Sequence, residues 1–238
     1  MSAAATPPPL DFDRYDALTF DCYGTLIDWE SGILAALRPV LASYEIELGD
    51  EEALALFGEL ESEIEAGPYR PYRDVLREVL IGFGDRLEFS PVVAQADAFA
   101  ASVADWPAFP DSAAALARLS ARFGLGVITN CDDDLFAASS QRLGNPFRWV
   151  VTAQQLGSYK PAHRNFELAL ERIGVPRERV LHVAQSLYHD HVPAHELGID
   201  SVWVNRRSGR AGSGATPPAA VQPTLEVPDM AALAALAT

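Results

Sequence analysis

One stretch determines how the rest of the chain is organised: Ala17-Leu18-Thr19-Phe20-Asp21-Cys22-Tyr23-Gly24-Thr25-Leu26-Ile27-Asp28. It starts with a short apolar run, which is typical of a strand buried on both faces of a parallel sheet. The run ends at Asp21, and the Gly-Thr pair that follows predicts a turn leaving the sheet. Because ligands of open α/β sheets bind beyond the carboxyl ends of the strands, we expect the Asp21 carboxylate to face a crevice. An acid that only caps a turn or the next helix is the alternative interpretation.

The composition limits the classes of function. The chain has 238 residues, 49% of them apolar, which is enough for one α/β core with a smaller inserted domain. Its formal net charge of −15 argues against nucleic acids and anionic membranes as partners. No apolar run approaches the roughly 20 residues that span a bilayer. Two cysteines and no signal peptide predict a reducing, cytoplasmic location.

The first half of the chain predicts a helical insertion. The Ala- and Pro-rich segment 1–13 has no periodicity and is expected to be loosely attached. Between residues 29 and 105 apolar residues recur at helical spacing, and no run is typical of a strand. Helices are expected at about 29–41, 50–60, 71–83 and 90–104. Because they directly follow the first strand, we interpret 29–105 as a cap over the crevice.

The second half predicts alternating helices and strands. Strands are expected at 126–130, 149–152, 180–184 and 201–205, separated by helices at about 111–123, 134–143, 162–173 and 193–197. This alternation requires a parallel sheet with right-handed crossovers. The Gly-, Ser- and Pro-rich segment 208–223 is expected to be a loose loop before a short last helix. Residues 1–28 and 106–238 would therefore form the core domain.

The motif Asp21-Cys-Tyr-Gly-Thr-Leu resembles motif I of the haloacid dehalogenase (HAD) superfamily. Tyr23, two places after the acid, is similar to the L-2-haloacid dehalogenase branch, whereas most phosphatases of the superfamily have a second Asp there. The resemblance implies a Rossmann-like α/β fold with strand order 3-2-1-4-5 and an inserted helical cap. It also implies that Asp21 is a nucleophile that forms an ester with its substrate.

The residue at position 23 decides between two reactions. In the phosphatase branch the Asp at this place protonates the leaving alkoxide, and losing such help costs a factor of about 10² to 10⁴. Tyr23 does not readily supply a proton at neutral pH, because its unperturbed pKa is about 10. A halide leaves without a proton, so Tyr23 favours dehalogenation. We also expect its ring to form a wall of the substrate pocket.

Two further segments resemble motifs II and III of the superfamily. In Val127-Ile-Thr-Asn the resemblance assigns Thr129 to the contact with the nucleophile or substrate and Asn130 to the pocket beside it. Lys160, before Pro161, stands where the family has its lysine. Its ammonium would keep Asp21 ionised and attract an anion, with about 4 kcal/mol at 4 Å and an effective dielectric constant of 20. A surface Lys-Pro helix start is the alternative.

The segment from Val180 to Asp190 resembles motif IV with one departure: Gln185 replaces a carboxylate that phosphatases have. Because Mg²⁺ prefers carboxylate oxygens, we expect no metal cofactor; if one binds, Asp21 and Asp190 would hold it. Asp190 is the candidate base that activates water for ester hydrolysis, with Ser186 positioning that water. Neighbouring helix residues do not share a face, so we do not interpret the nearby histidines as a metal cluster: His189, His191 and His195.

The cap conflicts with the resemblance. Dehalogenases of this branch use a cap arginine to receive the halide, but the helix expected to carry it has acids instead: Glu59, Glu61, Glu63 and Glu65. The nearest cations are Arg70 and Arg73, either of which we consider for substrate binding beside an apolar wall formed by Tyr69 and Tyr72. A solvated charged turn is the alternative, and the electrophile would then not need to be a haloacid.

These observations predict a hydrolase acting on carbon–halide bonds of small 2-haloalkanoic acids. Lys160, Thr129 and backbone N–H groups near Thr25 would hold the carboxylate of a small anionic organic substrate. A Mg²⁺-dependent phosphatase, or another hydrolase with an aspartyl ester on a different small electrophile, is the first alternative. A catalytically inert metabolite-binding relative is the second. Family members are often dimers, so the resemblance also implies a homodimer.

Overall fold

The core is a sheet of six parallel strands in the order β3-β2-β1-β4-β5-β6. The computed structural model describes residues 10–210 and 212–238. The strands are β1 (Ala17–Phe20), β2 (Gly124–Thr129), β3 (Trp149–Thr152), β4 (Val180–Ala184), β5 (Asp200–Val204) and β6 (Leu225–Val227). The predicted order 3-2-1-4-5 is confirmed. The short β6 extends the sheet at one edge and was not predicted, because three residues after a Gly- and Pro-rich segment carry little periodic signal.

The register of the sheet brings the candidate motifs to one edge. β1 is central, and its last residue Phe20 pairs with Val127 of β2 and with Val183 of β4. Parallel strands end at the same edge of a sheet, so the residues that follow β1, β2 and β4 meet there. Asp21, Asn130 and Gln185 are the residues that begin or lie in these connections.

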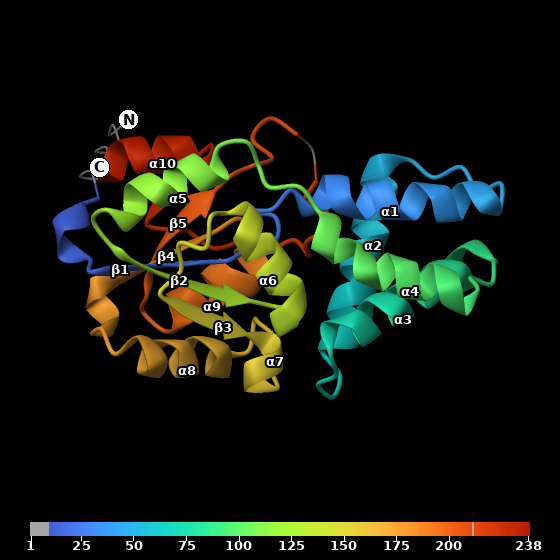
Figure 1. The fold of residues 1–238 in the computed structure, drawn as a ribbon, viewed down its shortest axis with the longest axis horizontal. Helices are drawn as coiled ribbons and strands as arrows, with labels where there is room; N and C mark the ends of the chain where they lie inside the picture. Colours follow the sequence, from blue (N-terminus) through green and yellow to red (C-terminus); the bar gives the residue numbers. More distant parts are fainter. Residues whose placement is uncertain (1–9, 211) are drawn as a thin grey trace, which may run out of the picture.

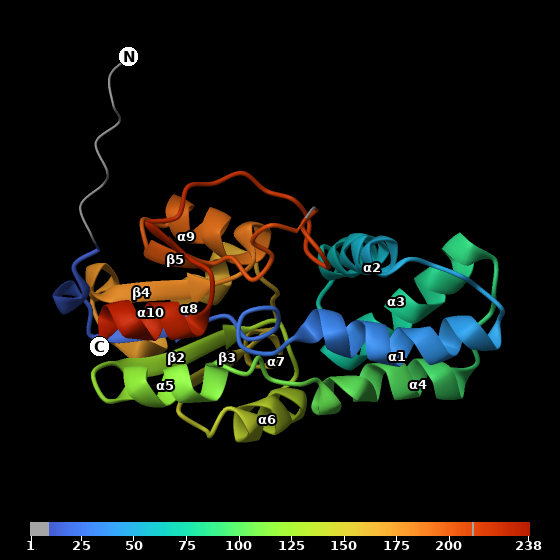
Figure 2. The ribbon, with the colours of Figure 1, turned by 90° about the horizontal axis from the view of Figure 1, so that it is seen from above.

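Helices cover both faces of the sheet (Figure 1). The core helices are α5 (Ser112–Ser120), α6 (Asp133–Arg142), α7 (Ala153–Leu156), α8 (His163–Ile173), α9 (Val192–Glu196) and α10 (Met230–Ala237). Helices α5 and α10 pack together on one face, while α8 and α9 lie on the other (Figures 1 and 2). Short 3₁₀ turns occur at Phe12–Arg14 and Arg177–Arg179, and a π-helical turn spans Leu187–His191.

The cap lies beside the carboxyl edge of the sheet (Figure 1). It comprises α1 (Trp29–Ser43), α2 (Asp50–Glu65), α3 (Tyr72–Leu87), α4 (Val93–Ala101) and a 3₁₀ turn, Ser102–Asp105. These helices form because each buries one apolar side, as Leu54, Phe57, Val79 and Phe83 show with no exposed surface. None of the helices among residues 10–210 and 212–238 is long and apolar enough to cross a membrane.

A core residue, Asp132, caps the N-terminus of the cap helix α3. Asp132, just after β2, accepts hydrogen bonds from the backbone N–H groups of Tyr72 at 2.9 Å and Arg73 at 3.1 Å. A carboxylate at this place satisfies free N–H groups at the start of α3 and interacts favourably with the helix dipole. Arg73 also forms a two-pronged ion pair with Asp134, at 2.7 Å to each oxygen. The start of α3 is therefore held on the core.

The loop after β5 joins the cap to the core on the other side. A Cβ atom at Gly58 of α2 would lie 2.7 Å from the carbonyl oxygen of Ala215, so glycine allows this close approach. Figure 2 shows this loop reaching α2. The segment 208–223 has no helix or strand among its described residues, as predicted, but Ala215 and Thr216 are buried rather than loosely attached. Of the segment 1–13, residues 1–9 lie outside the described part, and Phe12 is buried.

Candidate active site

Asp21 is held at the end of β1 by the turn that follows it. Its backbone N–H still donates to Val183 of β4 at 3.0 Å, so the carboxylate starts from the edge of the sheet. The turn needs Gly24, which has φ +89°, a conformation that other residues rarely adopt. A Cβ atom at position 24 would also lie 2.8 Å from Nε1 of Trp29. The turn therefore fixes Asp21 rigidly and brings α1 close to it.

Lys160 connects Asp21 with Asp190. Its Nζ atom donates hydrogen bonds to Oδ1 of Asp21 at 2.9 Å, to Oδ1 of Asp190 at 2.7 Å and to the carbonyl oxygen of Ile128 at 2.9 Å. An ammonium has three donors, and these contacts use all of them. The side chain of Lys160 is 1% exposed. In this arrangement Lys160 neutralises the two carboxylates and has no N–H group left for a substrate.

Burial and charge act against each other in this cluster. Burial raises the pKa of Asp21, and the attraction of Lys160 offsets this only in part. Burial alone would raise the pKa of Asp190 too, but Lys160 and a hydrogen bond with His182 hold it well below its usual range. Burial would lower the pKa of Lys160, yet the two carboxylates raise it above its ordinary value. Asp190 and Lys160 are therefore charged at neutral pH.

Thr25 supplies the second contact to the nucleophile. Its hydroxyl donates to Oδ2 of Asp21 at 2.6 Å, and its oxygen accepts the backbone N–H of Gln185 at 2.8 Å. The Gln185 N–H orients the hydroxyl so that its proton points at the carboxylate. Both oxygens of Asp21 thus accept hydrogen bonds, an arrangement that stabilises the ionised form needed for nucleophilic attack.

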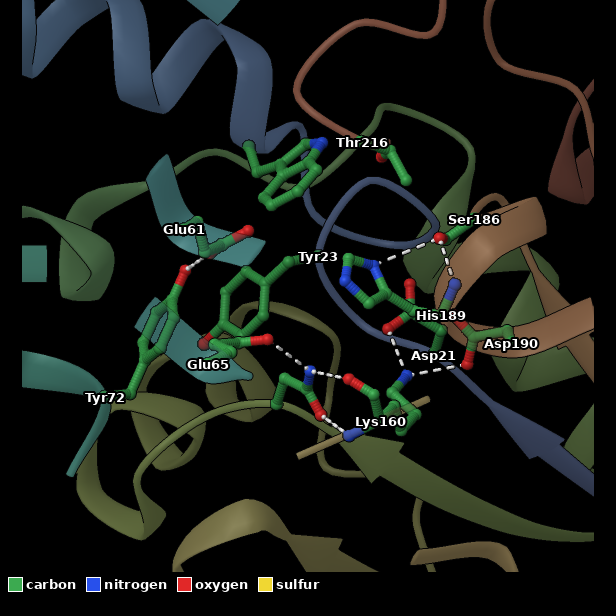
Figure 3. A pocket seen from close by; sticks show the side chains of 12 residues that line it. Asp21, Tyr23, Glu61, Glu65, Tyr72, Lys160, Ser186, His189, Asp190 and Thr216 are labelled. Atoms are coloured by element: carbon green, nitrogen blue, oxygen red, sulfur yellow. Dashed lines mark hydrogen bonds and ion pairs between the residues drawn. The ribbon is translucent and has the colours of Figure 1, made fainter. Parts of the chain in front are cut away.

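A pocket opens in front of this cluster. Its lining includes Asp21, Tyr23, Asn130, Lys160, Ser186 and Asp190 from the predicted site, and the structure brings these six together. It also includes Tyr72, which was predicted as part of an apolar wall. The remaining lining residues had no predicted role in the site: Trp29, Glu61, Glu65, His189 and Thr216. Figure 3 shows Glu61, Glu65 and Tyr72 on the cap side of the pocket, across from Asp21, Lys160 and Asp190.

Several predicted residues lie elsewhere. Thr129 is 1% exposed at the end of β2, and its hydroxyl has no hydrogen-bond partner. Tyr69 lines a neighbouring pocket that shares Glu65, Lys160 and His189 with the first.

The two cap arginines are also outside the pocket. Arg70 forms an ion pair with Glu78, and Arg73 forms one with Asp134. Neither arginine lines the pocket of Asp21. In this arrangement neither cation lies beside the nucleophile, and their contact with substrate stays a prediction.

The hydroxyl of Tyr23 contacts core side chains and is not placed to act as an acid or a base. It lies 3.1 Å from Oγ of Ser139 and 3.4 Å from Sγ of Cys131, both in the core interior. Burial raises its pKa well above the ordinary value of a tyrosine. The ring packs edge-on against Trp106, with centroids 5.6 Å apart. Tyr23 thus forms a wall of the pocket and offers no proton to a leaving group.

Two acids of α2 face the pocket in place of a cation. Glu61 is 3% exposed and accepts a 2.5 Å hydrogen bond from the Tyr72 hydroxyl, while Glu65 accepts one of 3.0 Å from Asn130. Burial raises the pKa of Glu61 to about 8 and that of Glu65 well above its usual range. Both therefore carry a proton at neutral pH. A spacing of four residues puts them on one helix face, a signal that was available in the sequence.

His182 supports the catalytic cluster from within the sheet. Its Nε2 atom lies 3.0 Å from Oδ1 of Asp190, and its Nδ1 atom lies 2.9 Å from Oγ1 of Thr19 on the neighbouring strand. The ring is fully buried, so it fixes the position of Asp190. Of the other histidines, His191 contacts Ser201 and the Ala184 carbonyl, which is not the arrangement of a metal ligand.

The donor set near the nucleophile does not fit a divalent cation. The two available carboxylates, Asp21 and Asp190, both direct an oxygen at the Lys160 ammonium. The neutral amide of Gln185 stands where the resemblance places a further carboxylate, and Mg²⁺ prefers carboxylate oxygens. Within residues 10–210 and 212–238, no group of three or more His, Cys, Asp or Glu side chains surrounds a cation position. We therefore derive no step through a metal.

Known proteins resemble the chain in sequence. (S)-2-haloacid dehalogenase 4A from Burkholderia cepacia is 27% identical over 212 residues, which cover 82% of this chain and 85% of the relative. The phosphatase YigB from Escherichia coli K12, which acts on 5-amino-6-(5-phospho-D-ribitylamino)uracil, is 30% identical over 222 residues, covering 82% and 86%. A match to haloacid dehalogenase-like hydrolase domain-containing protein 3 of Danio rerio, 32% identical over 125 residues, spans only 51% of each chain.

A solved structure shares the fold. The L-2-haloacid dehalogenase of Xanthobacter autotrophicus, solved with chloropropionic acid covalently bound, superposes with a TM-score of 0.76 at 23% identity, covering 93% of this chain and 98% of the other. The family model for haloacid dehalogenase-like hydrolases matches residues 15–187, and a second HAD-hydrolase-like model matches residues 159–233. These matches confirm the resemblance of the motifs to the L-2-haloacid dehalogenase branch. The chain belongs to the haloacid dehalogenase-like hydrolase family.

Proposed function

We propose that the protein hydrolyses small 2-haloalkanoic acids through a covalent ester on Asp21. An Asp21 oxygen attacks C2 of the substrate from the side opposite the halogen. The carbon–halogen bond breaks, and the halide leaves with its electron pair. Water then attacks the carbonyl carbon of the ester, which releases a 2-hydroxy acid and restores the carboxylate with one oxygen from water. One proton of that water passes through a base to the oxygen of the leaving 2-hydroxy acid, and the other is released to the solvent when Asp21 ionises again.

The observation that supports this reaction most is the position of the Tyr23 hydroxyl. It is directed at Ser139 and Cys131 and holds its proton far above neutral pH. The site therefore has no proton donor two residues after the nucleophile. An alkoxide leaving group needs such a donor, but a halide does not. Carbon–halogen cleavage is therefore the reaction whose rate suffers least from the lack of a proton donor at position 23.

In this proposal Asp190 is the base for the second half of the reaction, the hydrolysis of the ester. Its Oδ1 atom is held by Lys160 and His182, while its Oδ2 atom is buried without a partner and is free to accept a proton from water. Ser186 lines the same pocket and would help to position this water. Closure of the cap excludes bulk water and strengthens each of these contacts.

Halide release tests the proposal. The purified protein is incubated with 2-fluoro-, 2-chloro- and 2-bromopropanoate, with and without EDTA. We expect halide and lactate in equal amounts, no effect of EDTA, and no turnover by Asp21→Asn. The absence of halide from all three acids would contradict the proposal. Unchanged ligand binding without any turnover on a broad substrate panel would instead favour an inert relative.

A phosphatase is the second candidate, and the similarity to phosphatases such as YigB supports it. In that case Asp21 and Asp190 would have to hold Mg²⁺ despite their ion pairs with Lys160. Phosphate release from p-nitrophenyl phosphate that EDTA abolishes would favour this reaction over dehalogenation.

A further inference from the structure

The cap side of the active-site pocket carries an unusual balance of charge. Four carboxyl groups line the pocket, those of Asp21, Glu61, Glu65 and Asp190. Among the described residues, Lys160 is the only Lys or Arg side chain in this lining, and its three N–H groups are already used. Glu61 and Glu65 form hydrogen bonds with neutral groups, Tyr72 and Asn130, and neither forms an ion pair with another described residue. The pocket therefore holds two protonated carboxyl groups, Glu61 and Glu65, each of which can become an anion when a cation binds beside it.

The buried polar atoms of this pocket indicate the same kind of ligand. Oε1 of Glu65, Oδ2 of Asp190 and Oγ1 of Thr216 are buried without a hydrogen-bond partner. Thr216 is 5% exposed, and Figure 3 shows its side chain at the pocket. Oδ2 of Asp190 and Oγ1 of Thr216 can accept hydrogen bonds, and Oε1 of Glu65 can do so once Glu65 is ionised; an unsatisfied buried acceptor costs about 1 to 3 kcal/mol. A ligand with several N–H donors would satisfy them.

Aromatic rings complete this side of the pocket. Tyr23, Trp29 and Tyr72 all line it, from three different segments. A desolvated cation near the faces of such rings is stabilised by about 2 kcal/mol. Acidic oxygens combined with aromatic walls are the surroundings that favour an ammonium group rather than a halide or a second carboxylate.

We propose that Glu61, Glu65 and the aromatic walls form an ammonium subsite, and that the substrate carries a protonated amine beside the carbon that Asp21 attacks. The inference rests on the proposed function and narrows its substrate class to 2-halo acids that carry an amine, which are halogenated amino acids. It also explains why α2 has acids where a cap arginine was expected. The substrate is then a zwitterion whose ammonium faces the cap and whose carboxylate faces the turn after β1.

Binding of the ammonium is coupled to loss of a proton. Glu61 faces Tyr72 of α3, Glu65 of its own helix and Asp21 across the pocket, and in the free enzyme it is protonated at neutral pH. An ammonium favours the ionised carboxylate, so it displaces the Glu61 proton. Binding of the amine should therefore tighten as the pH rises towards 8. An anion without an amine should show the opposite trend, because ionised Glu61 repels it.

Two isosteric substrates test the subsite. In 3-amino-2-chloropropanoate an ammonium replaces the terminal methyl group of 2-chlorobutanoate. We expect kcat/KM for chloride release to be about 30-fold or more higher for the amine, because only its ammonium forms a buried ion pair with Glu61. Glu61→Gln should lower kcat/KM for the amine relative to that for 2-chlorobutanoate, so that the preference is lost. Glu63→Gln, on the exposed side of α2, is the matched control and should retain the preference. If Glu61→Gln does not fold, Glu65→Gln should lower the preference in the same direction.

A binding experiment separates this inference from the proposed function. Calorimetry of the expected products, 3-amino-2-hydroxypropanoate and 2-hydroxybutanoate, is carried out at pH 7 in buffers of different ionisation enthalpy. We expect tighter binding of the amine, with release of about one proton that Glu61→Gln abolishes. If no halide is released but this binding pattern is found, the result supports the ammonium subsite and contradicts the proposed dehalogenation. Equal binding of both products, or equal kcat/KM for both substrates, would overturn the subsite and leave dehalogenation intact.

Discussion

The Nζ atom of Lys160 lies 2.9 Å from Oδ1 of Asp21, although 139 residues separate them in the chain. This contact exists because the parallel strands end at one edge of the sheet, where the connections after β1 and β3 meet. It places a buried cation beside a buried nucleophile and links both to Asp190. The chemistry proposed for the site depends on this single ion cluster.

Removing the Lys160 charge should damage both stability and activity. Lys160→Met leaves two buried carboxylates without their partner, and breaking a buried pair in this way costs about 3 to 5 kcal/mol. Urea denaturation measures the loss. Arg164→Met, an exposed cation on α8, is the control and should change stability by no more than about 0.5 kcal/mol. Similar stability of the two variants would contradict the role of the cluster.

The hydroxyl of Thr25 should raise activity by orienting the nucleophile Asp21. Thr25→Val removes the 2.6 Å hydrogen bond to Asp21, whereas Thr25→Ser retains it. A hydrogen bond to a charged group is worth about 1.5 to 3 kcal/mol, so we expect kcat/KM for halide release to fall by about 10- to 150-fold in the valine variant. The serine variant should recover most of it. Equal activity of the two variants would show that the hydroxyl does not orient Asp21.

The protonation of Glu61 should be visible in the pH dependence of stability. The folded state keeps the Glu61 proton up to about pH 8, but the unfolded chain releases it near 4.5. The folded state therefore binds more protons in this window, and its stability falls as the pH rises, by up to about 1.4 kcal/mol per pH unit. Glu61→Gln should reduce this slope, while the exposed Glu63→Gln should not. Parallel curves for wild type and Glu61→Gln would contradict the assignment.

Docking of the cap should depend on Asp132. Asp132→Ala removes the acceptor for the first N–H groups of α3, which costs about 0.5 to 2 kcal/mol. Because the cap is then held less firmly over the pocket, KM for substrate should rise more than kcat falls. Steady-state halide release measures both constants. Asp85→Ala, an exposed acid near the other end of α3, should change neither.

Much of the fold follows from local patterns in the sequence. The strands 149–152 and 180–184 are found where the apolar runs predict them, because buried parallel strands are nearly continuous in apolar residues. The strand Leu225–Val227 and the helix Ala153–Leu156 are too short to show a period, and they form through tertiary contacts. The burial of Ala215 against α2 likewise depends on a contact 157 residues away along the chain.

The candidate site is predictable only where it follows strand ends. Asp21 and Asn130 come directly after strands, so their meeting at one edge follows from the parallel sheet. The contribution of the cap does not follow, because the orientation of α2 decides which of its acids face the pocket. Thr216 lies in a loop without any sequence signal, and its place at the pocket follows only from the docking of that loop on the cap.

The most direct test of the covalent mechanism is a single turnover in H₂¹⁸O. Excess enzyme is mixed with 2-chloropropanoate, digested, and examined by mass spectrometry of the peptide that contains Asp21. The mechanism predicts one ¹⁸O atom in Asp21 and none in the lactate, because water attacks the carbonyl carbon of the ester. Label found only in the lactate, with Asp21 unlabelled, would show that water attacks the substrate directly and would contradict the mechanism.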